Sequence, residues 1–194
     1  MFIKNIIEKI DASQRKTLVS LKDFRGRGKG KGTDILPSRS RGLYWLWCKT
    51  PLEQLKQTDH HGGAHVPIKK LLHNRNGLDH ICKIKEGEYR VLYNGMGGYS
   101  KWKKGSYYGL RGRINQEVIS NNTNTGTINI SGLELDLEDW KVSFFDFNDA
   151  ENHQLLKKLP EAKDWDVEKI YKEYANELEV LWRMHYGTPI LCRY

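Results

Sequence analysis

The sequence predicts a small α+β domain with its elements in the order strand, strand, helix, strand, helix. Segments 42–48, 89–93 and 140–147 are rich in aromatic and β-branched residues, which is typical of strands. Apolar residues four positions apart predict helices over 107–119 and 166–186. We therefore expect one antiparallel or mixed sheet with helices packed on it.

The length allows one hydrophobic core, because 194 residues with 38% hydrophobic content do not suffice for two full domains. We predict a domain over residues 42–194, preceded by an N-terminal helix and basic arm over residues 1–41. Isoleucines in 2–10 recur at helical spacing, and the helix is expected to continue raggedly to about Leu21. Residues 49–88 are polar and irregular, with a short element hinted at over 66–72, so we expect an insertion between the first two strands.

The charge favours a polyanionic partner. The formal net charge is +8 and the pI is about 9.3, and each cation set against a phosphate releases condensed counterions. The stretch RGRGKGKG at 25–32 has no apolar face and predicts a mobile basic loop. The residues expected to contact nucleic acid are Arg25, Arg27, Lys29, Lys31, Arg39, Arg41, Lys101, Lys103 and Lys104. Charge alone distinguishes neither DNA from RNA nor an enzyme from a passive binder.

The cysteines and the hydropathy pattern favour a cytoplasmic protein inside the cell. Cys48, Cys82 and Cys192 form an odd set without paired spacing, which argues against a disulfide framework. Charged residues interrupt 1–10, so no signal peptide is expected, and no run approaches the roughly 18 apolar residues of a membrane span.

Short motifs in the chain resemble those of the GIY-YIG nuclease family. Gly42-Leu43-Tyr44 corresponds to the first tripeptide and Tyr93-Asn94-Gly95 to the second. Leu110 to Arg113 is similar to the helix motif, and Glu179 precedes Pro189 as the metal-binding glutamate of the family does. The resemblance implies a small three-stranded antiparallel sheet flanked by helices.

The chain departs from the family pattern at three places. The 49–88 insertion lies where the family has little more than a hairpin, Asn94 replaces an aliphatic residue, and Cys192 stands where the family often has asparagine. These departures remove no catalytic side chain.

The resemblance implies a magnesium-dependent endonuclease that cuts double-stranded DNA, and the insertion favours a sequence-specific, restriction-type enzyme. Arg113, with Arg111 as a nearby substitute, would bind phosphate oxygens. Glu179 would hold Mg²⁺ or Mn²⁺. Tyr44 would act as the base if a cation or a metal-bound water lowered its pKa, and Tyr93 would orient the water or the phosphate. Cutting both strands requires either a homodimer or sequential nicking.

Other interpretations remain open at this point. A non-catalytic DNA- or RNA-binding protein on the same fold accounts equally well for the charge. Taken singly, Tyr44 and Tyr93 are typical core residues, and Glu179 is placed to pair with Arg183 four residues later. The histidines of the insertion could form a zinc site with Cys82, although their spacing matches no standard zinc motif; they are His60, His61, His65, His73 and His80. Asp139-Trp140-Lys141 also offers half of a second nuclease motif.

Overall fold

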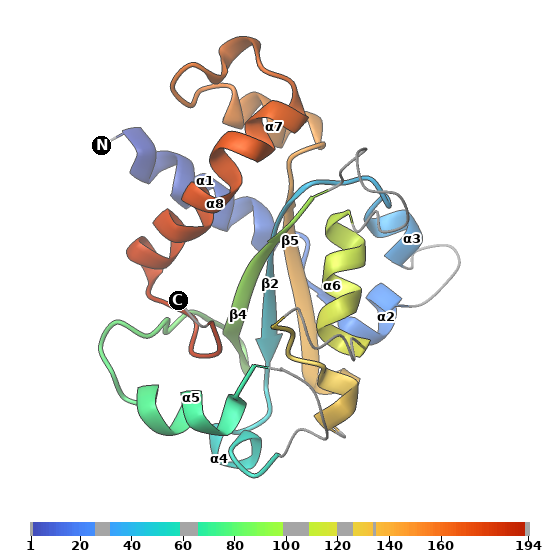
Figure 1. The fold of residues 1–194 in the computed structure, drawn as a ribbon, viewed down its shortest axis with the longest axis vertical. Coiled ribbons are helices and arrows are strands. Elements are labelled where there is room, and N and C mark those ends of the chain that lie inside the picture. Colours follow the sequence, from blue (N-terminus) through green and yellow to red (C-terminus); the bar gives the residue numbers. More distant parts are fainter. Residues whose placement is uncertain are drawn as a thin grey trace.

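One antiparallel sheet of five strands runs through the middle of the molecule in this computed structural model (Figure 1). The structure describes residues 2–25, 32–58, 66–98, 109–119, 126–133 and 135–192. The strands are β1 (Val19–Ser20), β2 (Gly42–Cys48), β3 (Lys85–Glu86), β4 (Tyr89–Gly97) and β5 (Trp140–Asp146). Their order across the sheet is β1-β5-β2-β4-β3, so β2 is central.

The predicted α+β class is confirmed, but the prediction of a small three-stranded sheet is wrong. The three expected strands are present as β2, β4 and β5, and two short strands extend the sheet at its edges. Each of these is two residues long, which is too short to show the alternation by which a strand is recognised. β1 lies in the expected tail of a helix, and β3 consists of two exposed charged residues.

β4 is also longer than expected. The predicted strand ends at residue 93, directly before the common turn sequence Asn94-Gly95, yet β4 continues to Gly97 and pairs with β2 as far as Gly42. The glycines do not form a turn here. They lie where a side chain and a helix approach the strand closely, as described below.

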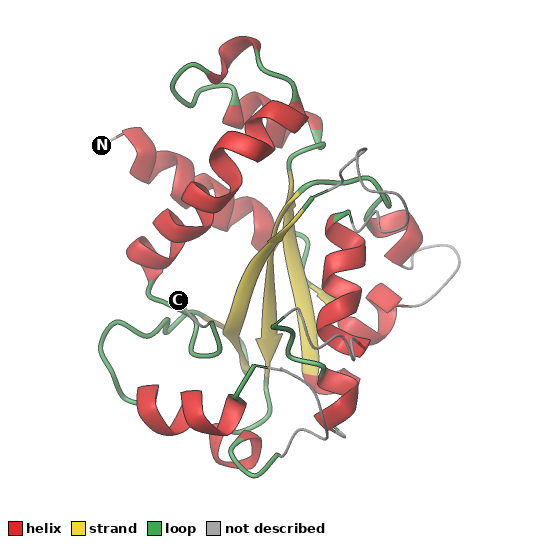
Figure 2. Cartoon of the chain, viewed as in Figure 1, coloured by secondary structure: helices red, strands yellow, loops and turns green. Residues whose placement is uncertain are grey.

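Helices cover both faces of the sheet (Figure 2). On one side α1 (Phe2–Arg15), α7 (Ala150–Leu156) and α8 (Val167–Tyr186) pack together, and α2 (Leu21–Arg25), α3 (Gly32–Ile35) and α6 (Leu110–Ile119) lie on the other. The insertion contributes α4 (Leu52–Leu55) and α5 (Ile68–Arg75) at one end of the sheet. Three 3₁₀ turns complete the list: Ile130–Leu133, Leu137–Asp139 and Ala162–Asp164.

The main helix predictions hold. α1 contains the predicted 2–10 segment and ends at Arg15, before the expected ragged tail. α6 begins at Leu110, and positions 107–108 lie outside the described residues. α8 begins after Asp166, whose side chain accepts a hydrogen bond from the backbone N–H of Lys169, as an N-cap residue does. Among the described residues, no helix is long and apolar enough to cross a membrane.

The central strand separates two hydrophobic cores. All seven residues of β2 are buried, and they alternate between the two faces. Tyr44, Leu46 and Cys48 belong to the core beneath α6, and that core also contains Leu55 and Leu72 of the insertion. On the opposite face, Leu43, Trp45 and Trp47 pack with side chains of α1 and α8. Both the N-terminal helix and the insertion therefore share the cores of the predicted nuclease domain.

The outer edge of β4 is only partly covered by another strand. β3 pairs with Tyr89 and Arg90 alone, and beyond them the C-terminal segment runs along the edge. The backbone N–H of Leu191 donates to the carbonyl of Leu92 at 2.9 Å, and the N–H of Asn94 donates to Cys192 Sγ at 3.3 Å. Beyond Arg90 the edge of β4 is therefore covered by the C-terminal segment and not by a strand.

Gly97 lets α6 lie directly on β4, so Gly97→Ala is expected to destabilise the fold. A β-carbon at this position would lie 2.8 Å from Leu110 Cα and 2.9 Å from Arg113 Cβ, and neither atom can move without shifting the helix. We expect the free energy of unfolding to fall by about 1–3 kcal/mol, which urea denaturation followed by tryptophan fluorescence will measure. Met96, the neighbouring exposed residue, gives a control: Met96→Ala should change the free energy of unfolding by about 0.5 kcal/mol or less. Equal unfolding midpoints for the two variants would contradict this account.

Candidate active site

A buried carboxylate, Glu117, joins the elements on the α6 side of the sheet. Tyr44 Oη donates to Glu117 Oε1 at 2.6 Å, and Arg113 Nη2 lies 2.9 Å from the same oxygen. The second oxygen accepts the backbone N–H of Ile128 at 2.9 Å. Glu117 and Tyr44 are both fully buried. A charged group in such a place is tolerated because donors surround it.

The local sequence explains this arrangement. Arg113 and Glu117 are four residues apart on α6 and so lie on one face of the helix. Tyr44 lies opposite Gly95 in the register of β2 and β4. A β-carbon at Gly95 would lie 2.6 Å from Tyr44 Oη, so the glycine of the second tripeptide leaves room for the phenol to cross the strand.

Tyr93 lies beside Tyr44 and extends the group toward solvent. The two ring centroids are 6.1 Å apart, and the charges of Glu117 and Arg113 act on the Tyr93 phenol. Tyr93 is half-buried and 21% of the Arg113 side chain is exposed, whereas Tyr44 and Glu117 lie behind them. Tyr93 and Arg113 are therefore the members of this group that a ligand would meet first.

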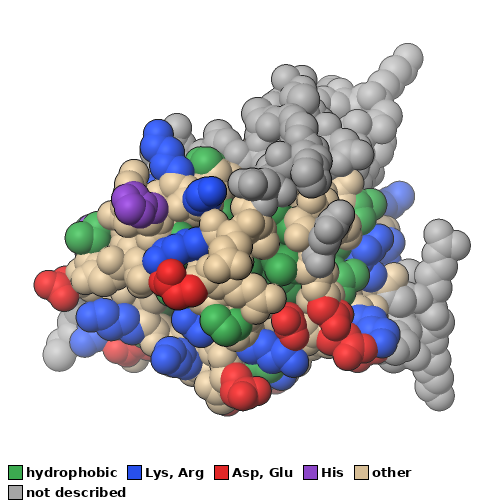
Figure 3. All heavy atoms as spheres, turned by 90° about the horizontal axis from the view of Figure 1, so that it is seen from below, with side chains coloured by type: hydrophobic (Ala, Val, Ile, Leu, Met, Phe, Trp, Pro, Cys, Tyr) green, Lys and Arg blue, Asp and Glu red, His purple; other side chains and the backbone are tan. Residues whose placement is uncertain are grey.

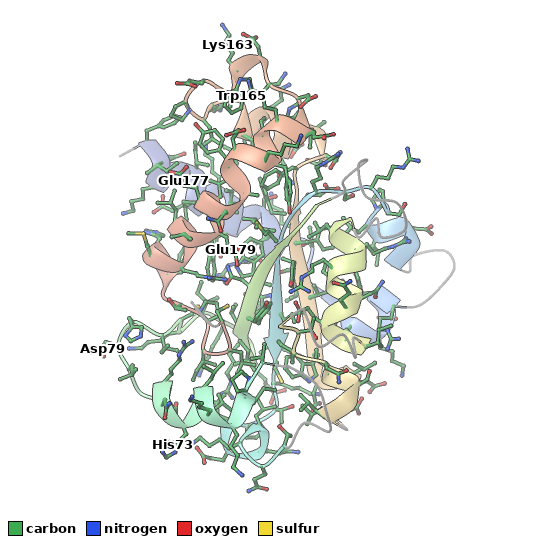
Figure 4. The ribbon with its side chains drawn as sticks, in the orientation of Figure 1. His73, Asp79, Lys163, Trp165, Glu177 and Glu179 are labelled. Atoms are coloured by element: carbon green, nitrogen blue, oxygen red, sulfur yellow. The ribbon has the colours of Figure 1, made fainter. Side chains whose placement is uncertain are left out.

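Glu179 approaches the same strand from the other face of the sheet. It lies on α8 at 7% exposure and forms an ion pair with Arg183, one helical turn later. Arg183 Nε in turn donates to Asn94 Oδ1 on β4 at 2.8 Å. Glu179 lies on the side of α8 that faces the sheet, whereas Glu177 is exposed; both are labelled in Figure 4.

The two groups influence one another electrostatically around the edge of β4. Arg113 lowers the pKa of Glu179, and Glu179 contributes to the raised pKa of Tyr93. Burial nevertheless dominates, and it keeps the pKa values of Glu117 and Glu179 above the ordinary range of a glutamate.

Neither tyrosine can act as a base at neutral pH without a further group, because both phenols have raised pKa values. Burial, followed by the charge of Glu117, raises the pKa of Tyr44 well above that of a free phenol and raises that of Tyr93 as well. Arg113 opposes both shifts without cancelling them. Both phenols are therefore neutral near pH 7, and a role as base requires a route for the proton.

The predicted site residues fall into distinct groups. The fold brings Tyr44, Tyr93 and Arg113 together on one face of the sheet, and it places Glu179 on the other face, where the charge of Arg113 still acts on its carboxylate. Arg111 is partly exposed on α6 and takes no part in the Glu117 contacts. The remaining predicted cations are placed as follows: Arg25 and Arg39 are exposed, Arg41 is buried and pairs with Glu168 at 3.0 Å, and Arg27, Lys29, Lys31, Lys101, Lys103 and Lys104 lie outside the described residues. A phosphate could reach Arg41 only if the pair with Glu168 opened.

Sequence reasoning missed Glu117, although its spacing from Arg113 was a usable signal. It also left unexplained the two departures from the family pattern, Asn94 and Cys192. These two residues contact each other, with Cys192 Sγ 3.2 Å from Asn94 Oδ1. Burial raises the pKa of Cys192 to about 12, so its thiol is neutral and serves as a weak hydrogen-bonding group.

Within the described ranges, no three His, Cys, Asp or Glu side chains gather in a way that could hold a metal ion. His60, His61 and His65 of the predicted zinc site lie outside those ranges. Mg²⁺ often takes one or two carboxylates and completes its shell with water and substrate phosphate. Glu179 offers one such oxygen donor. Its ion pair with Arg183 neutralises the negative charge to which a cation would bind.

The raised pKa of Glu117 predicts a specific pH dependence of stability. Since the folded protein binds this proton more tightly than the unfolded chain, the contribution is complete below pH 4.5 and is lost as the pH rises through the folded pKa. The free energy of unfolding of the wild type minus that of Glu117→Gln should therefore decrease as the pH rises. Urea unfolding of both proteins from pH 4 to 8 will measure this difference. Glu177→Gln controls for the loss of a surface carboxylate, and a wild-type advantage that grew with pH would refute the assignment.

Comparisons of the chain with models of known protein families, with curated protein sequences and with solved structures give no match. The resemblance to GIY-YIG nucleases therefore depends on the residues quoted above and on their arrangement at the edge of β4.

Proposed function

We propose that this protein is a magnesium-dependent endonuclease that hydrolyses phosphodiester bonds of double-stranded DNA by GIY-YIG-type chemistry. The observation that carries the proposal is the group formed by Tyr44, Tyr93 and Arg113 on one face of β4, with Glu179 on the other face and near enough for the charge of Arg113 to act on its carboxylate. A passive binder has no need for buried acidic groups close to the place where phosphate would lie.

Arg113 is suited to bind the reacting phosphate. Its guanidinium is partly exposed, and Glu117 fixes it at 2.9 Å while Gln116 Oε1 accepts from Nη1 at 3.2 Å. The remaining donors can form a fork to phosphate oxygens and stabilise the charge that develops on them. Because the helix and its partners already hold the side chain, little reorganisation is needed when substrate arrives.

The tyrosines are suited to position the attacking water. Tyr93 lies on the solvent side of the group and Tyr44 directly behind it. Glu179, together with the substrate phosphate, would hold the cation, which when bound adds positive charge at the reacting phosphate. Arg183 links the Glu179 carboxylate to β4, since its guanidinium pairs with Glu179 and also donates to Asn94 Oδ1.

The insertion supplies an exposed basic surface suited to the DNA duplex. Lys69, Lys70, Lys83 and Lys85 are exposed in this segment, and Arg25 and Arg39 add exposed charge elsewhere. The face seen from below carries basic side chains interspersed with acidic and apolar ones (Figure 3). Such a mixed surface is suited to reading a particular sequence, since base contacts need more than charge. As an enzyme acting on intracellular DNA it would work in the cytoplasm, and a homodimer would place one site on each strand.

The test is cleavage of plasmid DNA in the presence of Mg²⁺ or Mn²⁺. We expect the wild type to give discrete fragments, and Glu179→Ala and Tyr44→Phe to cut at least about 100-fold more slowly, because each removes a group that acts at the reacting phosphate or water. Glu177→Ala is the matched control, since it removes an exposed carboxylate from the same helix and should cut like the wild type. Fragment mapping will show whether the cuts are sequence-specific.

The other outcomes also discriminate. If both active-site variants cut as well as the wild type, the assignment of Tyr44 and Glu179 fails. Metal-independent binding of DNA by the wild type without any cutting would support the passive binder instead.

A further inference from the structure

Among the hydrogen bonds of the described residues, the Tyr44 hydroxyl donates one and accepts none. Its single hydroxyl hydrogen is committed to Glu117 at 2.6 Å, and no donor within the described ranges approaches its oxygen. A phenol oxygen can accept hydrogen bonds as well as donate one. Tyr44 is fully buried behind Tyr93 and Arg113, so a water must pass these two side chains before the phenol oxygen can accept its proton and pass its own proton to Glu117.

We propose that Glu117 is the proton acceptor behind Tyr44, so that the proton lost by the attacking water passes through the phenol to the buried carboxylate. This inference rests on the proposed nuclease function and assigns a role to a residue that the sequence resemblance did not indicate. Glu117 does not touch the substrate in this scheme. It positions the Tyr44 hydroxyl and accepts its proton.

The step is balanced as follows. As the water oxygen forms its bond to phosphorus, one of its protons moves to Tyr44 Oη, and the original phenol proton moves to Glu117 Oε1. The bond between phosphorus and the leaving oxygen breaks, and the leaving oxygen keeps the electron pair and takes a proton from solvent. Glu117 later returns its proton to solvent through the same phenol. Tyr44 is a neutral phenol before and after the step, which removes the need for a stable phenolate.

Proton uptake by Glu117 also strengthens the interaction of Arg113 with the phosphate while negative charge develops on the phosphate oxygens. Glu117 Oε1 is shared between the Tyr44 hydroxyl and the Arg113 guanidinium. A proton that arrives on this oxygen cancels the charge facing Arg113, so the guanidinium then faces the phosphate without a competing anion. The gain coincides with the development of negative charge on the phosphate oxygens.

The groups that face Glu117 are consistent with this role. They are Arg113 from its own helix, the hydroxyl of Tyr44 from β2, the phenol of Tyr93 from β4 and the backbone N–H of Ile128. Arg113 stabilises the ionised carboxylate, while full burial favours the protonated one. A carboxylate with both influences can hold a proton briefly and release it again.

The test is the pH dependence of DNA cleavage by Glu117→Gln. Glutamine keeps the size of the side chain but takes no proton. We expect kcat to fall about 100-fold with little change in KM, and the acid limb of the wild-type rate profile to disappear, because the group that must be ionised is gone. Gln116→Ala is the control: it removes another partner of Arg113 without touching a proton acceptor, and it should retain the acid limb.

A double variant separates proton transfer from support of Arg113. If Glu117 works through Tyr44, then Tyr44→Phe with Glu117→Gln should cut no more slowly than Tyr44→Phe alone. If the double variant cut more slowly than Tyr44→Phe by the full factor lost in Glu117→Gln, the inference would be overturned. A Glu117→Gln enzyme with the wild-type rate and acid limb would overturn it as well. In both cases the nuclease assignment would stand. A wild type that cuts no DNA would overturn both. If Glu117→Gln fails to fold, the profile of Tyr44→Phe decides alone, since it too must lose the acid limb.

Discussion

The arrangement of this site depends on one buried carboxylate. Glu117 lies in the core between α6 and the sheet, and it is stable there only because Tyr44, Arg113 and the backbone of Ile128 donate to it. The same bonds fix the Tyr44 hydroxyl, the guanidinium of Arg113 and the position of α6 over β4. A single buried carboxyl group thus links the packing of the helix to the arrangement of the proposed site.

Much of the fold could be predicted because its principal elements carry strong local signals. The aromatic residues of β2 and β5 and the apolar stripe of α8 correspond to buried faces, and each element was found in the expected place. The edge strands were missed because two residues cannot show a period. β4 was predicted to stop early because Asn94-Gly95 is a common turn sequence, whereas here long-range packing of Tyr44 requires the glycine.

The site could be predicted only in part, for a related reason. Tyr44, Tyr93, Arg113 and Glu179 were recognised through motifs; the fold groups the first three on one face of the sheet and places Glu179 on the opposite face. Glu117 belongs to no quoted motif, and its importance comes from a contact between β2 and α6 that local sequence does not encode. Asn94 and Cys192 looked like separate departures, yet they meet at the strand edge and help to hold Arg183 against Glu179.

The packing of α1 against α8 links the beginning of the chain to the proposed catalytic centre. Trp182 Nε1 on α8 donates to Asp11 Oδ1 on α1 at 3.1 Å, and both residues are buried. Trp182 follows Glu179 by less than one helical turn, so the first helix helps to set the angle at which α8 presents its carboxylate. The amino-terminal helix therefore packs as part of the domain core. A fusion or truncation that disturbed this helix would shift α8, and with it the carboxylate of Glu179.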